Sequence, residues 1–111
     1  MTFASGLGAL TTLSYLLKSG DHIITVDDVY GGTNRFFRNC ANRMGIETSF
    51  VDMTDLIETE KAFKANTAMC WIETPTNPTL KLVSSINFLF NFFLVYFIKF
   101  QKRLILKLFV K

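Results

Sequence analysis

The sequence predicts an α/β fold, built on a short and mostly parallel sheet with crossover helices. Short apolar strands alternate with helices of about ten residues, which is typical of parallel strands joined by helical crossovers. The apolar strand at 68–72 stops at two prolines, which cannot contribute to a sheet ladder. At 111 residues, the chain has room for one domain at most.

The first predicted element is a helix over residues 7–18. Ser5 is its expected N-cap, and Gly20 stands where a glycine commonly follows the last helical turn. Leucines recur at helical spacing and predict a buried stripe along one face. These leucines are Leu7, Leu10, Leu13, Leu16 and Leu17.

The remaining elements continue the alternation. Strands are expected at 23–26, 46–51 and 68–72, with a short fourth strand at 80–83, and helices at 34–44 and 55–64. Gly45 should end the second helix, and Thr54 is the expected N-cap of the third. The turn after residue 72 lies at the carboxyl end of a core strand, where open α/β sheets place their ligands.

Ser5-Gly6-Leu7 is the first of three loops with chemical potential. A helix N-terminus presents free N–H groups and the positive end of the macrodipole, and Gly6 would let a phosphate approach the backbone. A serine N-cap beside a glycine is also common where no ligand binds. The sequence leaves both interpretations open.

The second loop runs from Asp28 to Arg35. Gly31 and Gly32 make a tight loop that can come close to a ligand. Tyr30 could lay its ring on a flat heterocycle, and Arg35 could pair with a carboxylate or a phosphate. The alternative is a turn with two glycines, a tyrosine at the rim and a solvated arginine.

The third loop is Pro75-Thr76-Asn77-Pro78. Two prolines stiffen the backbone on either side of Asn77, whose amide offers both a donor and an acceptor. The alternative is an asparagine that only forms the turn. We therefore count Asn77 as a candidate ligand contact.

The combination of segments is far more specific than any of them alone. Residues 3–7, 27–35, 50–52 and 71–79, in this order and at these intervals, closely resemble the trans-sulfuration family of pyridoxal-phosphate (PLP) enzymes of Cys/Met metabolism. The resemblance covers roughly residues 2–83 and is greatest to the cystathionine gamma-lyases. The Gly-Gly-Thr-Asn-Arg segment favours these over cystathionine gamma-synthase, cystathionine beta-lyase and methionine gamma-lyase.

The resemblance implies a fold, an activity and a cofactor. Residues 1–83 would be a partial PLP-binding domain, part of the large domain of the type I, aspartate aminotransferase-like PLP-transferases. The activity would be a carbon–sulfur lyase that splits cystathionine into cysteine, 2-oxobutanoate and ammonia in cysteine biosynthesis, with pyridoxal 5′-phosphate as cofactor. Full-length members would be homo-oligomers that act on small sulfur amino acids.

The resemblance also implies a role for each candidate residue. Backbone N–H groups of Gly6 and Leu7 would hold the cofactor phosphate. Tyr30 would stack on the pyridine ring and act as a catalytic residue in substrate proton transfer. Asn77 would hydrogen-bond the ring hydroxyl, and Arg35, like Tyr30, would lie at the substrate site.

Two groups that this chemistry needs cannot be assigned in the sequence. A Schiff-base lysine and an acidic partner for the pyridine nitrogen would follow the Pro-Thr-Asn-Pro turn by tens of residues. The lysines near the C-terminus lack the Ser-x-Thr-Lys context of the family; they are Lys99, Lys102, Lys107 and Lys111. We therefore expect the chain to be inactive alone. The alternative to an enzyme fragment is a non-catalytic, truncated subunit that binds full-length partners.

Residues 84–111 form a hydrophobic, basic tail that does not follow the family pattern. Phe, Ile, Asn, Lys, Leu and Tyr, which AT-rich codons encode, make up 22 of its 28 residues. The first hypothesis is therefore translated noncoding sequence joined after Val83. The rival is a membrane anchor, but its apolar run, 86–98, has 13 residues against about 20 in a spanning helix, which disfavours membrane association.

Charge and cysteine content argue against other classes of function. The net charge of +3 comes from the tail, because residues 1–83 carry seven basic and nine acidic side chains, so the basic pI does not indicate nucleic-acid binding. Cys40 and Cys70 lack metal-ligand spacing and predict reduced, buried thiols in a cytoplasmic protein. No metal site and no secretory signal are expected.

Overall fold

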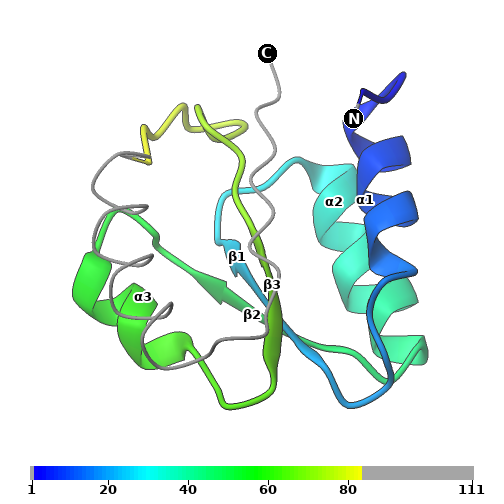
Figure 1. Cartoon of the computed structure of the whole chain (residues 1–111). Helices are drawn as coiled ribbons and strands as arrows, with labels where there is room; N and C mark the ends of the chain where they lie inside the picture. The colour runs from blue at the N-terminus through cyan, green and yellow to red at the C-terminus, as the bar shows by residue number, and fades with distance from the viewer. Residues whose placement is uncertain (1, 84–111) are drawn as a thin grey trace.

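The computed structural model describes residues 2–83, and residue 1 and residues 84–111 lie outside this description (Figure 1). The hypotheses about the tail therefore fall on residues that are not described. The helices are α1 (Gly6–Ser14), α2 (Gly31–Arg35), which continues as the π-helical segment η1 (Phe36–Ala41), and α3 (Leu56–Ala62). The strands are β1 (His22–Val26), β2 (Glu47–Val51) and β3 (Thr67–Trp71).

The three strands form one parallel sheet in the order β2-β1-β3. In its register, His22 lies opposite Glu47 and Val26 lies opposite Val51. Figure 1 shows α1 and α2 on one side of the sheet and α3 on the other. The strand order reverses at β1, so the carboxyl ends of β1 and β3 meet where open α/β sheets bind ligands. The predicted α/β class with a parallel sheet is confirmed.

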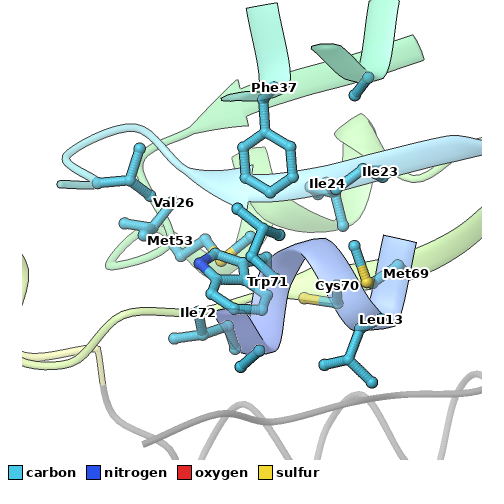
Figure 2. Packing of buried hydrophobic residues seen from close by; sticks show 14 of the residues in the cluster. Leu13, Ile23, Ile24, Val26, Phe37, Met53, Met69, Cys70, Trp71 and Ile72 are labelled. Carbon is cyan, nitrogen blue, oxygen red and sulfur yellow. The ribbon is translucent and has the colours of Figure 1, made fainter. Parts of the chain in front are cut away.

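A buried apolar cluster holds the sheet against its helices (Figure 2). Every residue of β1 is buried, and Phe37 of η1 meets Trp71 of β3 edge to face, with ring centroids 6.3 Å apart. Full burial of a large apolar side chain contributes about 1.5–3 kcal/mol to the free energy of unfolding. This packing fixes the ends of β1 and β3, from which the loops of the site emerge.

The first helix, α1, is shorter than predicted and ends at Ser14 rather than near residue 18. The hydroxyls of Thr11 and Thr12 donate to backbone carbonyls four residues earlier, at 2.8 and 2.9 Å, and such local bonds weaken a helix. Gly20 does take a left-handed conformation, with φ +91°, but in the turn before β1 rather than at the end of α1.

The early end of α1 also narrows the leucine stripe. Leu10 and Leu13 are buried, but Leu16, beyond the helix, is 62% exposed. Leu7 is exposed as well, and Leu17 is half-buried. The prediction of five buried leucines was therefore wrong for the two ends of the stripe.

The second and third helices begin at residues other than those predicted. α2 begins at Gly31 instead of Asn34, so the two glycines belong to its first turn and not to the loop. Asp55, and not Thr54, is the N-cap of α3, because the Asp55 carboxylate accepts the N–H of Ile57 at 2.9 Å. An aspartate cap has the same physical basis as a threonine cap, displaced by one residue.

Two further predictions were wrong. Within the described part of the chain, residues 80–83 form no strand, because Leu80 takes a left-handed conformation, with φ 57°, that breaks an extended path. Cys40 is exposed, because η1 buries its Phe37 and Ala41 positions instead. Cys70 is a buried free thiol as predicted, and burial raises its pKa.

Candidate functional site

A cavity of about 680 Å³ lies beyond the carboxyl ends of β1 and β3, beside the N-terminus of α1. All three loops predicted to carry chemistry contribute to it, and their segments lie at the upper end of the sheet in Figure 1. Its lining consists of Ser5, Gly6, Leu7, Tyr30, Thr33, Glu73, Pro75, Thr76, Asn77 and Leu80. The structure thus brings together four residues predicted for the site, namely Gly6, Leu7, Tyr30 and Asn77.

The N-terminus of α1 supplies backbone donors to this cavity. Ser5 is the N-cap, as predicted: its hydroxyl accepts the N–H of Gly8 at 3.0 Å, and its carbonyl accepts the N–H of Ala9 at 3.0 Å. The N–H groups of Gly6 and Leu7 precede these bonds and have no carbonyl of the preceding turn to reach. Over residues 2–83 neither N–H group has an acceptor, so both are donors at the positive end of the helix dipole, where an anion is favoured.

The Tyr30 ring lies against the first turn of its own helix. A Cβ added to Gly32 would fall 2.7 Å from Cε1 of Tyr30 and 3.1 Å from Cδ1 of Leu7. Gly32 is therefore needed as a glycine so that both side chains can approach it, whereas a Cβ at Gly31 would meet no atom within 4 Å. Tyr30 is 51% exposed and lines the cavity, so it is accessible to a ligand.

Glu73 is a residue of the site to which the sequence pattern assigned no role. The residue is 7% exposed, and its two carboxylate oxygens accept three hydrogen bonds. The donors are the backbone N–H of Tyr30 at 2.8 Å, the hydroxyl of Thr33 at 2.8 Å and the indole N–H of Trp71 at 3.2 Å. The available signal was an acidic residue directly after a buried strand, where a carboxylate needs partners to be buried.

The Pro-Thr-Asn-Pro turn is attached to the loop after β1 through Asp28. The hydroxyl of Thr76 and the backbone N–H of Thr79 donate to the Asp28 carboxylate at 2.6 and 3.0 Å. The backbone N–H of Asn77 donates to the Asp28 carbonyl at 3.3 Å. Hydrogen bonds from Thr76 and then Thr79 lower the pKa of Asp28. Asn77 is thereby held at the cavity while its side chain stays exposed.

Lys81 holds the chain after this turn. Its ammonium group lies 3.0 Å from a carboxylate oxygen of Asp52 and 3.5 Å from one of Asp27, so it links the segments that follow β2 and β1. The pKa of Asp52 is lowered to about 2, mostly by the hydrogen bond from the Thr54 hydroxyl and next by the one from Lys81. Ion pairs at this degree of exposure contribute little to the free energy of unfolding, so their effect here is to orient the turn.

Comparison with known proteins identifies the family. The model of the Cys/Met metabolism PLP-dependent enzymes matches residues 1–88. This chain belongs to that family. It is 55% identical over 82 residues to cystathionine gamma-lyase of Rattus norvegicus, and 54% identical over 82 residues to a probable cystathionine gamma-synthase of Herpetosiphon aurantiacus.

The family resemblance extends to the fold. A crystal structure of cystathionine gamma-lyase from Lactobacillus plantarum, complexed with L-serine, superposes with a TM-score of 0.69 at 42% sequence identity. The match covers 72% of this chain and 21% of that one. The two curated relatives are covered over 21% and 26% of their lengths, against 74% of this chain in each case. The chain thus spans about a fifth to a quarter of the relatives that it matches.

The residues at the cavity fit the cofactor that the family name implies. PLP carries a phosphate, a flat pyridine ring and a ring hydroxyl. The N–H groups of Gly6 and Leu7 at the start of α1 suit the phosphate, and the ring of Tyr30, a half-exposed residue, suits the pyridine ring. The exposed amide of Asn77 suits the hydroxyl, because it can both donate and accept a hydrogen bond.

Arg35 stands apart from these residues. It lies at the end of α2, is exposed, and does not belong to the lining of the cavity. Over residues 2–83, no group of three or more His, Cys, Asp or Glu side chains is placed to hold a metal ion. The same residues include no helix that is long and apolar enough to cross a membrane.

Proposed function

We propose that residues 2–83 form the part of a PLP site that contacts the phosphate and one face of the ring, in a cystathionine gamma-lyase-like carbon–sulfur lyase. The observation that carries the proposal is the convergence of the α1 N-terminus, Tyr30 and Asn77 on one cavity. The identity of 55% to a cystathionine gamma-lyase supports the choice of reaction. The substrate would be cystathionine, converted with water into cysteine, 2-oxobutanoate and ammonia.

PLP, when bound, acts as an electron sink for the bonds broken at the substrate. Gly6 and Leu7 hold its phosphate through backbone N–H groups, with the α1 dipole favouring the anion. Tyr30 orients the ring by stacking and carries a phenol that can pass a proton between substrate atoms. The Asn77 amide fixes the rotation of the PLP ring by a hydrogen bond to the ring hydroxyl. Arg35 would lie near the substrate carboxylate.

A cystathionine gamma-synthase activity is the second candidate, because a probable cystathionine gamma-synthase is 54% identical to this chain over 82 residues. Both activities would use the same cofactor contacts. Beyond the Gly-Gly-Thr-Asn-Arg segment, further residues that distinguish them would come from the parts of the relatives that this chain does not match. Methionine gamma-lyase activity would share these contacts as well.

We expect the chain to catalyse no turnover by itself, because no lysine of the sequence can be assigned to the Schiff base. The decisive experiment replaces the matching segment of rat cystathionine gamma-lyase with residues 2–83. The chimaera should bind PLP and release 2-oxobutanoate from cystathionine. A folded chimaera that binds no PLP would refute the proposed function, and turnover by the 111-residue chain alone would refute its inactivity.

A non-catalytic role as a truncated subunit is the alternative to an enzyme fragment. The resemblance described above implies that full-length members of the family form homo-oligomers. In this role, the chain would associate with full-length subunits. Co-purification of the tagged chain with rat cystathionine gamma-lyase would support this role, and a monomer at all concentrations would count against it. The cytoplasmic location stays a prediction from the cysteine pattern.

A further inference from the structure

Glu73 occupies the position of a helix cap, although it lies on a different element from the helix. It follows β3, and its carboxylate accepts the backbone N–H of Tyr30, the N-cap residue of α2, at 2.8 Å. The same carboxylate accepts the hydroxyl of Thr33, the third residue of α2, at 2.8 Å. In an ordinary capping box, a glutamate at this third position reaches back to the N-cap N–H. Here Glu73 takes over that role from the neighbouring strand.

α2 needs such a cap from outside. The side chain of Tyr30 makes no capping hydrogen bond, and the first turn holds no acidic residue. Gly31 and Gly32, its first two residues, are poor helix formers. A carboxylate at the N-terminus supplies an acceptor for a free N–H group and a charge that the helix dipole favours. Without Glu73, the turn that carries Tyr30 has little to hold it in helical form.

The conformation of this turn sets the place of the Tyr30 ring. The ring packs back onto Gly32, where an added Cβ would fall 2.7 Å from Cε1 of Tyr30. The contact exists only while Gly32 is in the first turn of α2, directly after the capped residue. The ring and the cap are therefore parts of one local structure, with the carboxylate buried and the ring half exposed at the cavity.

We propose that Glu73 is the positioning residue for Tyr30: by capping α2 from the end of β3, it holds the Tyr30 ring against Gly32 at the face of the cavity. An apolar side chain would fill the same space but would leave the N–H of Tyr30 and the hydroxyl of Thr33 without an acceptor. The inference rests on the proposed function only where it takes the Tyr30 ring as the contact for the PLP ring.

The first test uses the free 111-residue chain and measures the position of Tyr30 directly. A Glu73→Gln variant keeps the shape but turns one acceptor into a donor. We expect amide exchange at Tyr30 to accelerate about tenfold, and the nuclear Overhauser contact between the Tyr30 ring and Gly32 to be lost. Glu60→Gln, on the exposed side of α3, is the matched control and should change neither. A ring contact that persists in Glu73→Gln overturns the inference.

A second pair of variants keeps the test valid if Glu73→Gln does not fold. Thr33→Val removes one donor to the carboxylate, while Thr33→Ser retains the hydroxyl. We expect Thr33→Val to weaken the contact between the Tyr30 ring and Gly32, and Thr33→Ser to restore it. Equal behaviour of the two Thr33 variants would contradict the proposed cap.

The ligand test separates positioning from general loss of structure. Calorimetric titration would use pyridoxine 5′-phosphate, which has no aldehyde to react with lysines, and inorganic phosphate. Glu73→Gln should weaken the affinity for pyridoxine 5′-phosphate about tenfold and change the affinity for inorganic phosphate by no more than about twofold. Equal losses for both ligands would refute a role specific to Tyr30. If the unchanged chain binds neither ligand, the proposed function fails, and the exchange and ring-contact data still decide the role of Glu73.

Discussion

Replacing Gly32 with alanine should move the Tyr30 ring without disturbing the fold. The added Cβ would lie 2.7 Å from Cε1 of Tyr30 and 3.1 Å from Cδ1 of Leu7, distances at which neighbouring atoms must shift. The Tyr30 ring can shift easily, because this residue is 51% exposed. Gly31→Ala is the matched control, since a Cβ at Gly31 meets no atom within 4 Å.

The substitution has two opposing effects on the free energy of unfolding, a gain in helix propensity and a steric cost. Alanine in place of glycine stabilises a helix by about 0.5–1 kcal/mol, and both variants gain this amount. Forcing extra volume into a packed site costs about 1–3 kcal/mol, but rotation of an exposed ring lowers that cost. We therefore expect Gly31→Ala to raise the free energy of unfolding and Gly32→Ala to leave it nearly unchanged. Loss of ring stacking, worth about 0.5–1.5 kcal/mol, should weaken the affinity for pyridoxine 5′-phosphate about two- to tenfold, and only in Gly32→Ala.

Trp71 provides the assay, because it is the single tryptophan of the sequence and its indole N–H donates to Glu73, which lines the cavity. Quenching of its fluorescence by pyridoxine 5′-phosphate gives the dissociation constant, and urea denaturation gives the free energy of unfolding. Equal affinity in Gly32→Ala and Gly31→Ala would show that the position of the Tyr30 ring does not matter for binding. A large loss of stability in Gly32→Ala would show that Tyr30 and Leu7 cannot move aside.

Three further predictions concern pH and the ends of elements. The pKa of His22 is lowered by burial, so the unfolded chain takes up a proton near pH 6.5 while the folded chain resists it. The free energy of unfolding should therefore fall as pH drops below about 6.5, and urea midpoints at pH 7.5 and 5.5 should show no such change in His22→Gln. The pKa of Asp28 is lowered below 3.8, chiefly by the hydroxyl of Thr76. The Pro-Thr-Asn-Pro turn should therefore stay attached at pH 5 and loosen as the pH falls below 3.8, which amide exchange would reveal. Ser5→Ala removes the acceptor for the N–H of Gly8 and should lower the free energy of unfolding by about 1 kcal/mol, measured by urea denaturation.

The sequence predicted the elements that rest on local chemistry. Apolar runs located the three strands, and a serine before an apolar periodicity located the start of α1. Periodicity alone does not register the hydroxyls of Thr11 and Thr12, which donate to carbonyls within α1, and such bonds weaken a helix. The N-terminus of α2 was missed for a different reason. Its cap, Glu73, is forty-three residues away from Tyr30 in the chain, so the two glycines had the pattern of a loop.

Several residues of the candidate site were predictable from the sequence, but the part played by Glu73 was not. Tyr30, Asn77 and the α1 N-terminus do line one cavity, because parallel strands bring their following loops to the same edge. Arg35 carried the same kind of signal and lies outside that lining. Arg35 stands at the last position of α2, four residues beyond its start at Gly31, and it is exposed.

Two carboxylates join the loops of the site in a reciprocal way. Asp28, after β1, accepts hydrogen bonds from the turn after β3, which carries Asn77. Glu73, after β3, accepts hydrogen bonds from the helix after β1, which begins at Tyr30. Tyr30 and Asn77 are therefore each held by a carboxylate that follows the neighbouring strand, and the distance between these two contacts depends on the β1–β3 pairing. It follows that loss of Glu73 should displace Tyr30 while Asn77 stays attached, and that loss of Asp28 should do the reverse.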